Sequence, residues 1–292
     1  MGIGILYESE EWSTYALRDR IEAMGIPAKL ICMEKEVSFS DLEDCELILN
    51  RVFASSQFRG HQKSLEQTPR ILKELEEHKV PVINPGISHR YETDKALTAK
   101  VLEQHGIPVP EIYGIVRKGG EAERKVSYPC VLKPNCGGRT TYTYILNNER
   151  EYREALCEIP DIEMLAEEYI EPVYGYLTRI EVIGGECRLI LKRSVTENGL
   201  SAYHLGSAYQ FHPECSEEIK RTAVRAMEIL KIETGSMDVI ETEQGFYIID
   251  VNAVSNASED NTETFQFDLM LETAKYAVKQ YKEMKEGKED DN

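Results

Sequence analysis

The stretch that most constrains the fold covers residues 236–252 and reads SMDVIETEQGFYIIDVN. Apolar β-forming residues flank the polar segment 243–245 on both sides, which predicts two antiparallel strands joined by a tight turn. Gly245 suits the left-handed position of a three-residue hairpin loop. Such a loop would pair Thr242 with Phe246 and so fix the register of the whole hairpin.

Counting outward from that pair places Asp238 directly opposite Asp250. Because side chains alternate along a strand, Asn252 shares their face. Two carboxylates and an amide oxygen then converge in the middle of apolar strands. A hard divalent cation, Mg²⁺ above all, binds such oxygens together with water and phosphate. The alternative is a solvated hairpin face that carries two aspartates, since facing carboxylates buried without a metal would repel each other.

Charge and cysteine content narrow the classes of function. The 292 residues include 34 Lys and Arg against 52 Asp and Glu, a net charge of −18. This balance argues against nucleic-acid binding and against adhesion to anionic membranes. No apolar run approaches the roughly 20 residues of a membrane span, and the first residues lack the layout of a signal peptide. The 7 scattered cysteines contain no Cys-x-x-Cys pair, which favours reduced thiols in a cytoplasm over a disulfide framework or zinc site.

The first third of the chain alternates short apolar strands with helical patterns, which is typical of a parallel α/β layer. The expected strands cover residues 2–7, 28–33, 46–50 and 81–84, and the expected helices cover 12–24 and 69–78.

The remainder predicts a mixed arrangement of helices and strands. A helix capped by Thr93 should run to about His105, because Gly-Ile-Pro follows it. Further strands are expected at 129–133, 142–146, 164–170, 177–183 and 187–193, and further helices at 217–230 (capped by Ser216) and 262–284.

Taken in order, these segments resemble the ATP-grasp superfamily, and within it the branch of ribosomal-protein glutamate ligases and amino-acid-adding carboxylate–amine ligases. No single motif is as specific as a Walker loop, so the resemblance depends on the ordered series. The series is VINP (82–85), TDK (93–95), GIPVP (106–110), YPCVLKP (128–134), GG (137–138), EEYIEP (167–172), TRIEVIGG (178–185), KR (192–193) and MDVIE…IIDVN (237–252).

The resemblance implies an α/β fold in which an N-terminal Rossmann-like pre-grasp domain precedes a two-subdomain ATP-grasp fold. The pre-grasp domain would cover residues 1–87 and the ATP-grasp domain residues 88–292, with a lid subdomain at about 122–168.

Four residues are candidates for gripping the phosphates of a nucleotide. Lys95 stands at a helix start and Lys133 at a strand end, and both could hold polyphosphate as point charges. Gly137 and Gly138 follow in a loop where backbone N–H groups could approach phosphate oxygens closely. Taken alone, either lysine is better interpreted as an ordinary surface ammonium.

The segment Glu167-Glu168-Tyr169-Ile170-Glu171 matches the hinge between ATP-grasp subdomains. The resemblance implies that Glu167, Glu168, Ile170 and Glu171 surround the adenine and ribose. By itself the segment would read as an exposed strand edge.

The resemblance also implies roles in the reaction. Arg179 and Arg193 match the two arginines that approach the transferred phosphate and the acyl substrate, where a planar guanidinium suits developing charge. Asp238, Asp250 and Asn252 match the triad that places one or two Mg²⁺ ions, or Mn²⁺, between the β- and γ-phosphates. A surface ion pair is the alternative for each arginine in so acidic a chain.

Three departures from the family pattern stand out. The second metal carboxylate is commonly Glu and here is Asp250, about one methylene shorter. Leu177 stands where the nearest branch has an acidic residue for the ribose, so Glu171 is the candidate substitute. The loop after residue 133 carries less glycine than usual, and Arg139 within it is a candidate contact for phosphate or substrate.

Two segments are candidates for substrate recognition. The polar and aromatic stretch 196–207 lies where the family binds its substrate, although it is equally readable as a solvent loop. Arg51 and Arg59, after the third strand, could hold a carboxylate in the crevice outside the carboxyl ends of the strands.

The resemblance therefore implies a cytoplasmic, ADP-forming carbon–nitrogen ligase that uses ATP and Mg²⁺. An acyl phosphate would form from a small-molecule or peptide acid, and an amine would attack it; a homodimer or homotetramer is compatible with the family. Two alternatives stay open: a nucleotide-binding regulator that has lost ligation, and a kinase-like phosphotransferase on the same fold.

Overall fold

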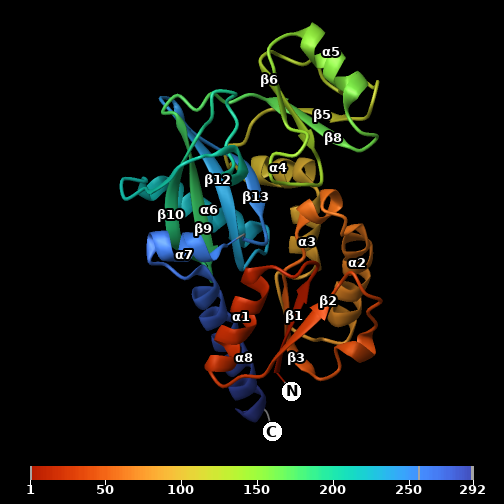
Figure 1. Ribbon diagram of the computed structural model, residues 1–292, viewed down its shortest axis with the longest axis vertical. Coiled ribbons are helices and arrows are strands. Elements are labelled where there is room, and N and C mark those ends of the chain that lie inside the picture. The colour runs from red at the N-terminus through yellow and green to blue at the C-terminus, as the bar shows by residue number, and fades with distance from the viewer. Residues whose placement is uncertain (1, 256, 291–292) are drawn as a thin grey trace.

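The computed structural model describes residues 2–255 and 257–290, which form three β-sheets with helices packed against them (Figure 1). The mixed α/β class predicted from the sequence is confirmed. The sheet that begins at the N-terminus and the sheet within residues 112–168 lie at opposite ends of the long axis.

The first sheet is parallel, with strand order β2-β1-β3-β4. Its elements are β1 (Gly2–Tyr7), α1 (Trp12–Ala23), β2 (Ala28–Cys32), β3 (Cys45–Asn50), α2 (Gln62–Glu77) and β4 (Val82–Ile83), with short 3₁₀ turns at Phe39–Asp41 and Ala54–Phe58. Strand β1 is buried along its whole length, as expected of a parallel strand covered on both faces. The C-terminal helix α8 (Leu269–Asp290) packs beside α1 on one face, where Leu17 and Met270 share a core, and Ile71 of α2 covers the other.

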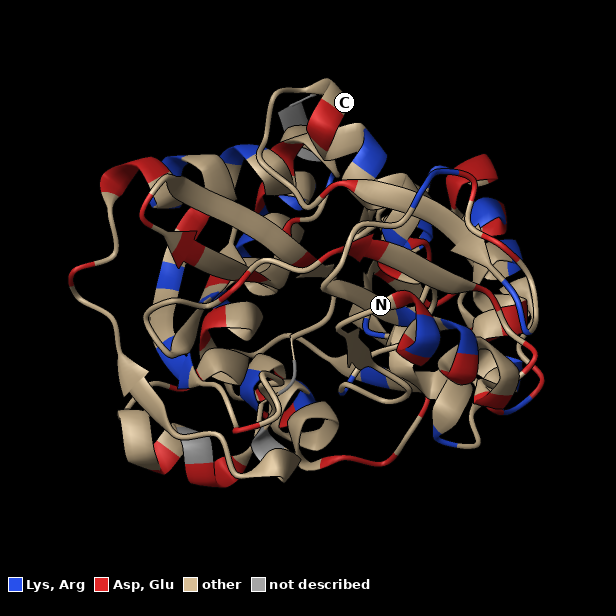
Figure 2. Ribbon diagram, turned by 90° about the horizontal axis from the view of Figure 1, so that it is seen from above, with Lys and Arg blue, Asp and Glu red and all other residues tan. Residues whose placement is uncertain are grey.

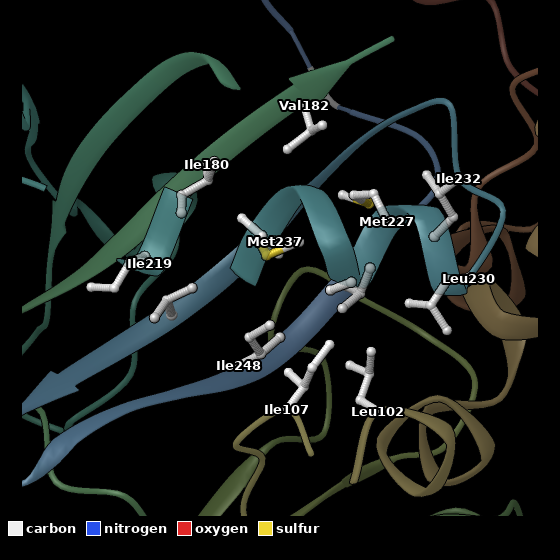
Figure 3. Close-up of a cluster of buried hydrophobic side chains, with 14 of the residues drawn as sticks. Leu102, Ile107, Ile180, Val182, Ile219, Met227, Leu230, Ile232, Met237 and Ile248 are labelled. Atoms are coloured by element: carbon white, nitrogen blue, oxygen red, sulfur yellow. The ribbon is translucent and has the colours of Figure 1, made fainter. Parts of the chain in front are cut away.

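The second sheet is antiparallel, with order β11-β10-β9-β12-β13. Its strands are β9 (Tyr176–Ile183), β10 (Glu186–Ser194), β11 (Tyr209–Phe211), β12 (Thr234–Thr242) and β13 (Gly245–Asn252). Helix α6 (Glu217–Ile229) covers one face. Met227 and Leu230 lie over Met237 and Ile248 of the sheet (Figure 3). The opposite face of this sheet is therefore left to form the site.

The third sheet is antiparallel, with order β5-β8-β6-β7. Its strands are β5 (Ile112–Val116), β6 (Cys130–Pro134), β7 (Tyr144–Leu146) and β8 (Met164–Glu168). Helix α5 (Glu149–Glu158) covers it through Tyr152 and Leu156, and the Asn148 side chain caps that helix. Helices α3 (Gly86–Thr93) and α4 (Lys95–Gln104) precede this sheet in the chain.

Two helix predictions need correction. Helix α2 begins at Gln62 rather than at residue 69. Its first turns were not predicted because they bury polar residues and show little apolar periodicity. Among these, buried Gln67 donates to the Lys35 carbonyl at 2.7 Å. The predicted last helix is two helices, α7 (Glu259–Phe265) and α8. The helix is interrupted after Phe265, and a new helix begins at Leu269 because Asp268 caps it, accepting from Leu271 N at 2.9 Å.

One buried side chain ties the first sheet to the second. Asn84, just after β4, donates through Nδ2 to the carbonyls of Thr234 (2.7 Å) and Ala253 (2.6 Å). Its Oδ1 accepts from Glu233 N (2.8 Å) and Thr234 N (3.2 Å). The asparagine of the VINP motif thus joins β4 to the beginning of β12 and the end of β13.

Charged residues of both signs are interspersed along the ribbon rather than gathered in one basic stripe (Figure 2). Among the residues that the structure describes, no helix combines the length and the apolar character needed to cross a bilayer.

Candidate functional site

The hairpin of β12 and β13 places Asp238 directly opposite Asp250, as predicted. The predicted route to this register is wrong, because Thr242 pairs with Gly245 rather than with Phe246. The turn has one residue fewer than expected, and a β-bulge at Ile249 inserts one extra residue into β13. The two differences cancel, so the carboxylates face each other.

The bulge also supplies a partner for Lys133, the penultimate residue of β6. The Lys133 ammonium donates to the Ile249 carbonyl at 2.9 Å and forms an ion pair with Glu167 Oε1 at 2.6 Å. Burial raises the pKa of the Glu167 carboxyl, and Lys133 opposes this shift without cancelling it. Lys133 and Glu167 are therefore held side by side between the second and third sheets.

Lys95 opens helix α4, and its cap differs from the prediction. Asp94, not Thr93, caps the helix, accepting from Leu97 N at 3.0 Å; Thr93 is the last residue of α3. The Lys95 ammonium forms a short ion pair with Asp250. Burial lowers the pKa of Lys95, but Asp250 outweighs that effect and the net shift is upward.

Two arginines converge on Asp238. Arg193 of β10 bonds Asp238 Oδ2 at 2.7 Å, and Arg179 of β9 approaches Oδ1 at 3.4 Å. Arg179 also bonds Glu181 at 3.0 Å and the Ser236 hydroxyl at 2.6 Å. Burial alone would raise the pKa of Asp238, but the two guanidinium groups outweigh it and hold that pKa below its usual value. Asp238 is therefore a carboxylate at neutral pH.

The glycine-rich loop after β6 packs on the 3₁₀ segment Ala54–Phe58. Gly137 has φ +152°, and a Cβ there would lie 2.6 Å from the Phe58 ring, so only glycine allows this close approach. Arg139 forms an ion pair with Glu11 at 3.2 Å. Burial raises the pKa of Cys136 to about 11, which makes this thiol a packing group rather than a nucleophile.

Two cavities meet beneath this loop. The smaller, of about 140 Å³, is bordered by Lys95, Lys133 and the segment 167–170 and by apolar side chains that include Ile145 and Leu177. The larger, of about 390 Å³, extends along β10. Both are lined by Gly137, Gly138, Arg139, Thr140, Arg193, Ser201, Asp238 and Asp250. The charged residues predicted from the sequence thus surround the junction of two compartments.

The donor set at this junction suits Mg²⁺. Among the described residues, no group of three or more His, Cys, Asp and Glu side chains could by itself hold a metal ion. The junction offers the carboxylates of Asp238 and Asp250 and the amide of Asn252. A hard cation with few protein ligands completes its shell with phosphate oxygens and water. Asp238, Asp250 and Asn252 are therefore suited to a cation that arrives with a nucleotide.

The residues predicted to contact the adenine and ribose divide between the smaller cavity and the surface. Leu177, Glu168 and Ile170 line the smaller cavity, whereas Glu171 is exposed and is not among its lining residues. In the loop 196–207, Ser201 accepts from Arg193 Nε at 2.9 Å.

Arg51 and Arg59 do not border either cavity. Arg51 is buried and donates to the Ser13 hydroxyl at 3.3 Å, while Arg59 forms ion pairs with Glu8 and Glu11. Their partners lie within the first domain, so the structure does not bear out a carboxylate clamp there.

Sequence reasoning missed two residues that hold the site together. Glu92 is buried and accepts from Ala54 N at 3.1 Å and from Ala253 N, just after Asn252. Burial raises its pKa to about 7. Asn135 accepts from Ala96 N at 2.9 Å and so ties the glycine-rich loop to α4. Neither belongs to a periodic pattern, and only their partners, remote in sequence, reveal them.

A family model described as a RimK-like ATP-grasp domain matches residues 92–276. The chain belongs to the RimK-like ATP-grasp family. The match includes both lysines, both arginines and the aspartate hairpin, and it excludes the parallel sheet of the first domain.

Individual relatives of this ATP-grasp chain are distant. A probable alpha-L-glutamate ligase of Histophilus somni (strain 2336) is 24% identical over 218 residues, 73% of this chain and 72% of that protein. An ATP-grasp RimK domain protein from Sphaerobacter thermophilus superposes with a TM-score of 0.69 at 19% identity, covering 94% and 99% of the two chains. A D-alanine–D-alanine ligase from Bacillus anthracis, solved with ATP, superposes with a TM-score of 0.64 at 16% identity, covering 96% of this chain and 98% of that chain. The two structural similarities concern the fold alone.

Proposed function

We propose that this ATP-grasp protein is an ATP-dependent, ADP-forming ligase that joins a carboxylate to an amine, with an amino acid or peptide among its substrates. The observation that carries the proposal is the junction of the two cavities at Arg193, Asp238 and Asp250. A nucleotide in the smaller cavity directs its outer phosphates to the junction, and the acid and amine approach from the larger one. Curated relatives named as ligases support the same activity.

The proposed residue roles follow from position. Lys133 and Lys95 hold the phosphates, Gly137 and Gly138 let the loop backbone approach them, and the segment 167–170 borders the base. Asp238, Asp250 and Asn252 would hold one or two Mg²⁺ or Mn²⁺ ions. When bound, the metal neutralises phosphate charge.

In the proposed reaction, a carboxylate oxygen of the acid attacks the γ-phosphorus. The bond from that phosphorus to the β–γ bridging oxygen breaks, and ADP leaves. The amine nitrogen then attacks the acyl carbon, the carbon–oxygen bond to the phosphoryl group breaks, and phosphate leaves while the nitrogen gives up a proton. Arg193, buried beside Asp238, stabilises the charge that develops on the transferred group, and Arg179 orients Asp238.

The domain division is proposed on the same basis, with residues 1–87 as the pre-grasp domain, residues 88–292 as the ATP-grasp domain, and a lid at about 122–168. The ladder of the third sheet adds β5 (Ile112–Val116) to that lid.

The test measures ADP release across paired pools of amino acids and short peptides in the presence of Mg²⁺ and ATP. A ligase releases ADP only when an acid and an amine are both present. ADP release with a single hydroxyl acceptor, together with a phosphorylated product, would identify a kinase. ATP binding without ADP release from any pool would identify a regulator.

A further inference from the structure

The larger cavity changes character along β10. Leu189, Leu191 and Arg193 alternate along this strand and all line the cavity. The intervening Ile190 packs against the core beneath α6, and Lys192 pairs with Glu214 at 3.3 Å. Four residues of strand span roughly 13 Å, so the β10 wall of the cavity runs that far from the charged Arg193 to the apolar Leu189. On the neighbouring strand β9, Arg179 pairs with Leu191 and Glu181 with Leu189, and both of these charged residues line the same cavity.

The chain after β13 completes the apolar end. Phe265, Phe267 and Leu269 line the cavity there. The rings of Phe265 and Phe211 pack edge to face, with 5.3 Å between their centroids, and Phe211 is 55% exposed. Phe211 pairs with Leu191 across β10 and β11. The apolar wall therefore continues outward to the surface.

The cationic side chains of the described lining already have carboxylate partners. Arg179 bonds Glu181 at 3.0 Å, Arg193 bonds Asp238 at 2.7 Å, and Arg139 bonds Glu11 at 3.2 Å. Arg139 and Arg193 also belong to the junction with the smaller cavity, at the phosphate end. The Arg179–Glu181 ion pair lies beside Leu191 and Leu189. An acidic substrate side chain at the Leu189 end would therefore meet Glu181 and no arginine or lysine within the described lining that lacks a carboxylate partner; the exposed imidazole of His204 is the remaining basic group.

From this gradient we infer that the substrate lying along β10 is an amino acid, or the terminal residue of a peptide, with a bulky apolar side chain, rather than glutamate. The inference rests on the proposed ligase function and deepens it. Leu189, Leu191 and Phe265 select the side chain, while the charged end holds the reacting groups. This chain then differs in substrate from the relatives that are named glutamate ligases.

The first test compares matched substrates on the wild-type protein. ADP release is measured with Mg²⁺, ATP and a fixed pool of partner substrates, adding leucine, methionine or phenylalanine in one set and glutamine, glutamate or aspartate in the other. Methionine and glutamine have side chains of similar length and differ in polarity. The expected kcat/KM for methionine exceeds that for glutamine and glutamate by at least about tenfold, since apolar pockets discriminate to this extent. Turnover that prefers glutamate overturns the inference and leaves the ligase proposal standing. Absence of ADP release with every pair overturns both.

A second test moves the preference by substitution. Leu189→Arg adds a cation to the apolar end and should lower the methionine-to-glutamate ratio of kcat/KM at least tenfold, whereas Leu189→Met should keep it. Lys192→Met, on the opposite face of the same strand, is the matched control and should also keep the ratio. Equilibrium dialysis of radiolabelled methionine and glutamate against each variant with ADP and Mg²⁺ reads the same preference without turnover. An unchanged ratio in a folded Leu189→Arg protein, by either measurement, contradicts the assignment of this wall.

Discussion

Replacing Asn84 tests how the two domains are joined. Its side chain makes four hydrogen bonds to the backbone of Glu233, Thr234 and Ala253, at 2.6 to 3.2 Å, and it is fully buried. At about 1 kcal/mol for each bond, Asn84→Ala should lower the free energy of unfolding by about 4 kcal/mol. Asn84 also has φ +58°, which costs a residue with a Cβ about 1 kcal/mol more than glycine. Asparagine already pays this cost, so Asn84→Gly relieves it and should lose only about 3 kcal/mol.

Urea unfolding measures both variants. Fluorescence of Trp12, the single tryptophan, reports on helix α1 of the first domain, and far-ultraviolet circular dichroism reports on the whole chain. Coincident transitions in the wild type would license the free-energy comparison. A loss below about 1.5 kcal/mol for Asn84→Gly would mean that water replaces the lost bonds, and the account of Asn84 as the joint between domains would then be wrong.

Three further predictions concern the site. Asp250→Asn should lower turnover by more than about tenfold while far-ultraviolet circular dichroism stays unchanged, since even the loss of a residue that only supports a metal ligand costs about ten- to hundredfold; more than about a tenth of wild-type activity would refute the metal role. Lys133→Ala should weaken ATP binding more than AMP binding in calorimetry, because in the proposed site its charge faces the outer phosphates, and equal losses would place it elsewhere. Burial raises the pKa of the Glu92 carboxyl from 4.5 in the unfolded chain to about 7 in the native state. Between these two values the native state keeps a proton that the unfolded chain loses. The free energy of unfolding should therefore fall by about 3 kcal/mol as the pH rises through this range. Glu92→Gln should remove this slope from urea midpoints measured between pH 5 and 8, whereas an identical slope would show that the carboxyl is already charged.

Local patterns in the sequence predicted most of the strands, although not β5 or β11, and they missed helices α3 and α5. Alternating apolar residues and a turn signal predicted the hairpin, and the register of Asp238 and Asp250 followed by counting. The bulge at Ile249 could not be predicted, because a bulge leaves no periodic trace in a strand that is apolar on both sides. The register was correct because the shorter turn offset the extra residue.

Contacts between remote segments were not predictable in the same way. Glu92 and Asn135 hold the site through backbone groups of segments far away in the chain, and a single buried polar residue has no spacing that marks it. Arg51 and Arg59 were misread for a related reason. Their position after a strand indicated a crevice, but acidic and hydroxyl partners within the same domain already bond them.

The fate of the acid's oxygen atoms tests the central claim most directly. If the γ-phosphoryl group passes to the carboxylate and the amine then displaces it, ¹⁸O placed in that carboxylate must appear in the released phosphate, with ADP as the nucleotide product. The proposed phosphate clamp of Lys95, Lys133, Arg193 and the Asp238–Asp250 pair predicts this outcome, because in that proposal it surrounds the outer phosphates. Label that stays in the acid, or release of AMP and pyrophosphate, would contradict the acyl-phosphate route.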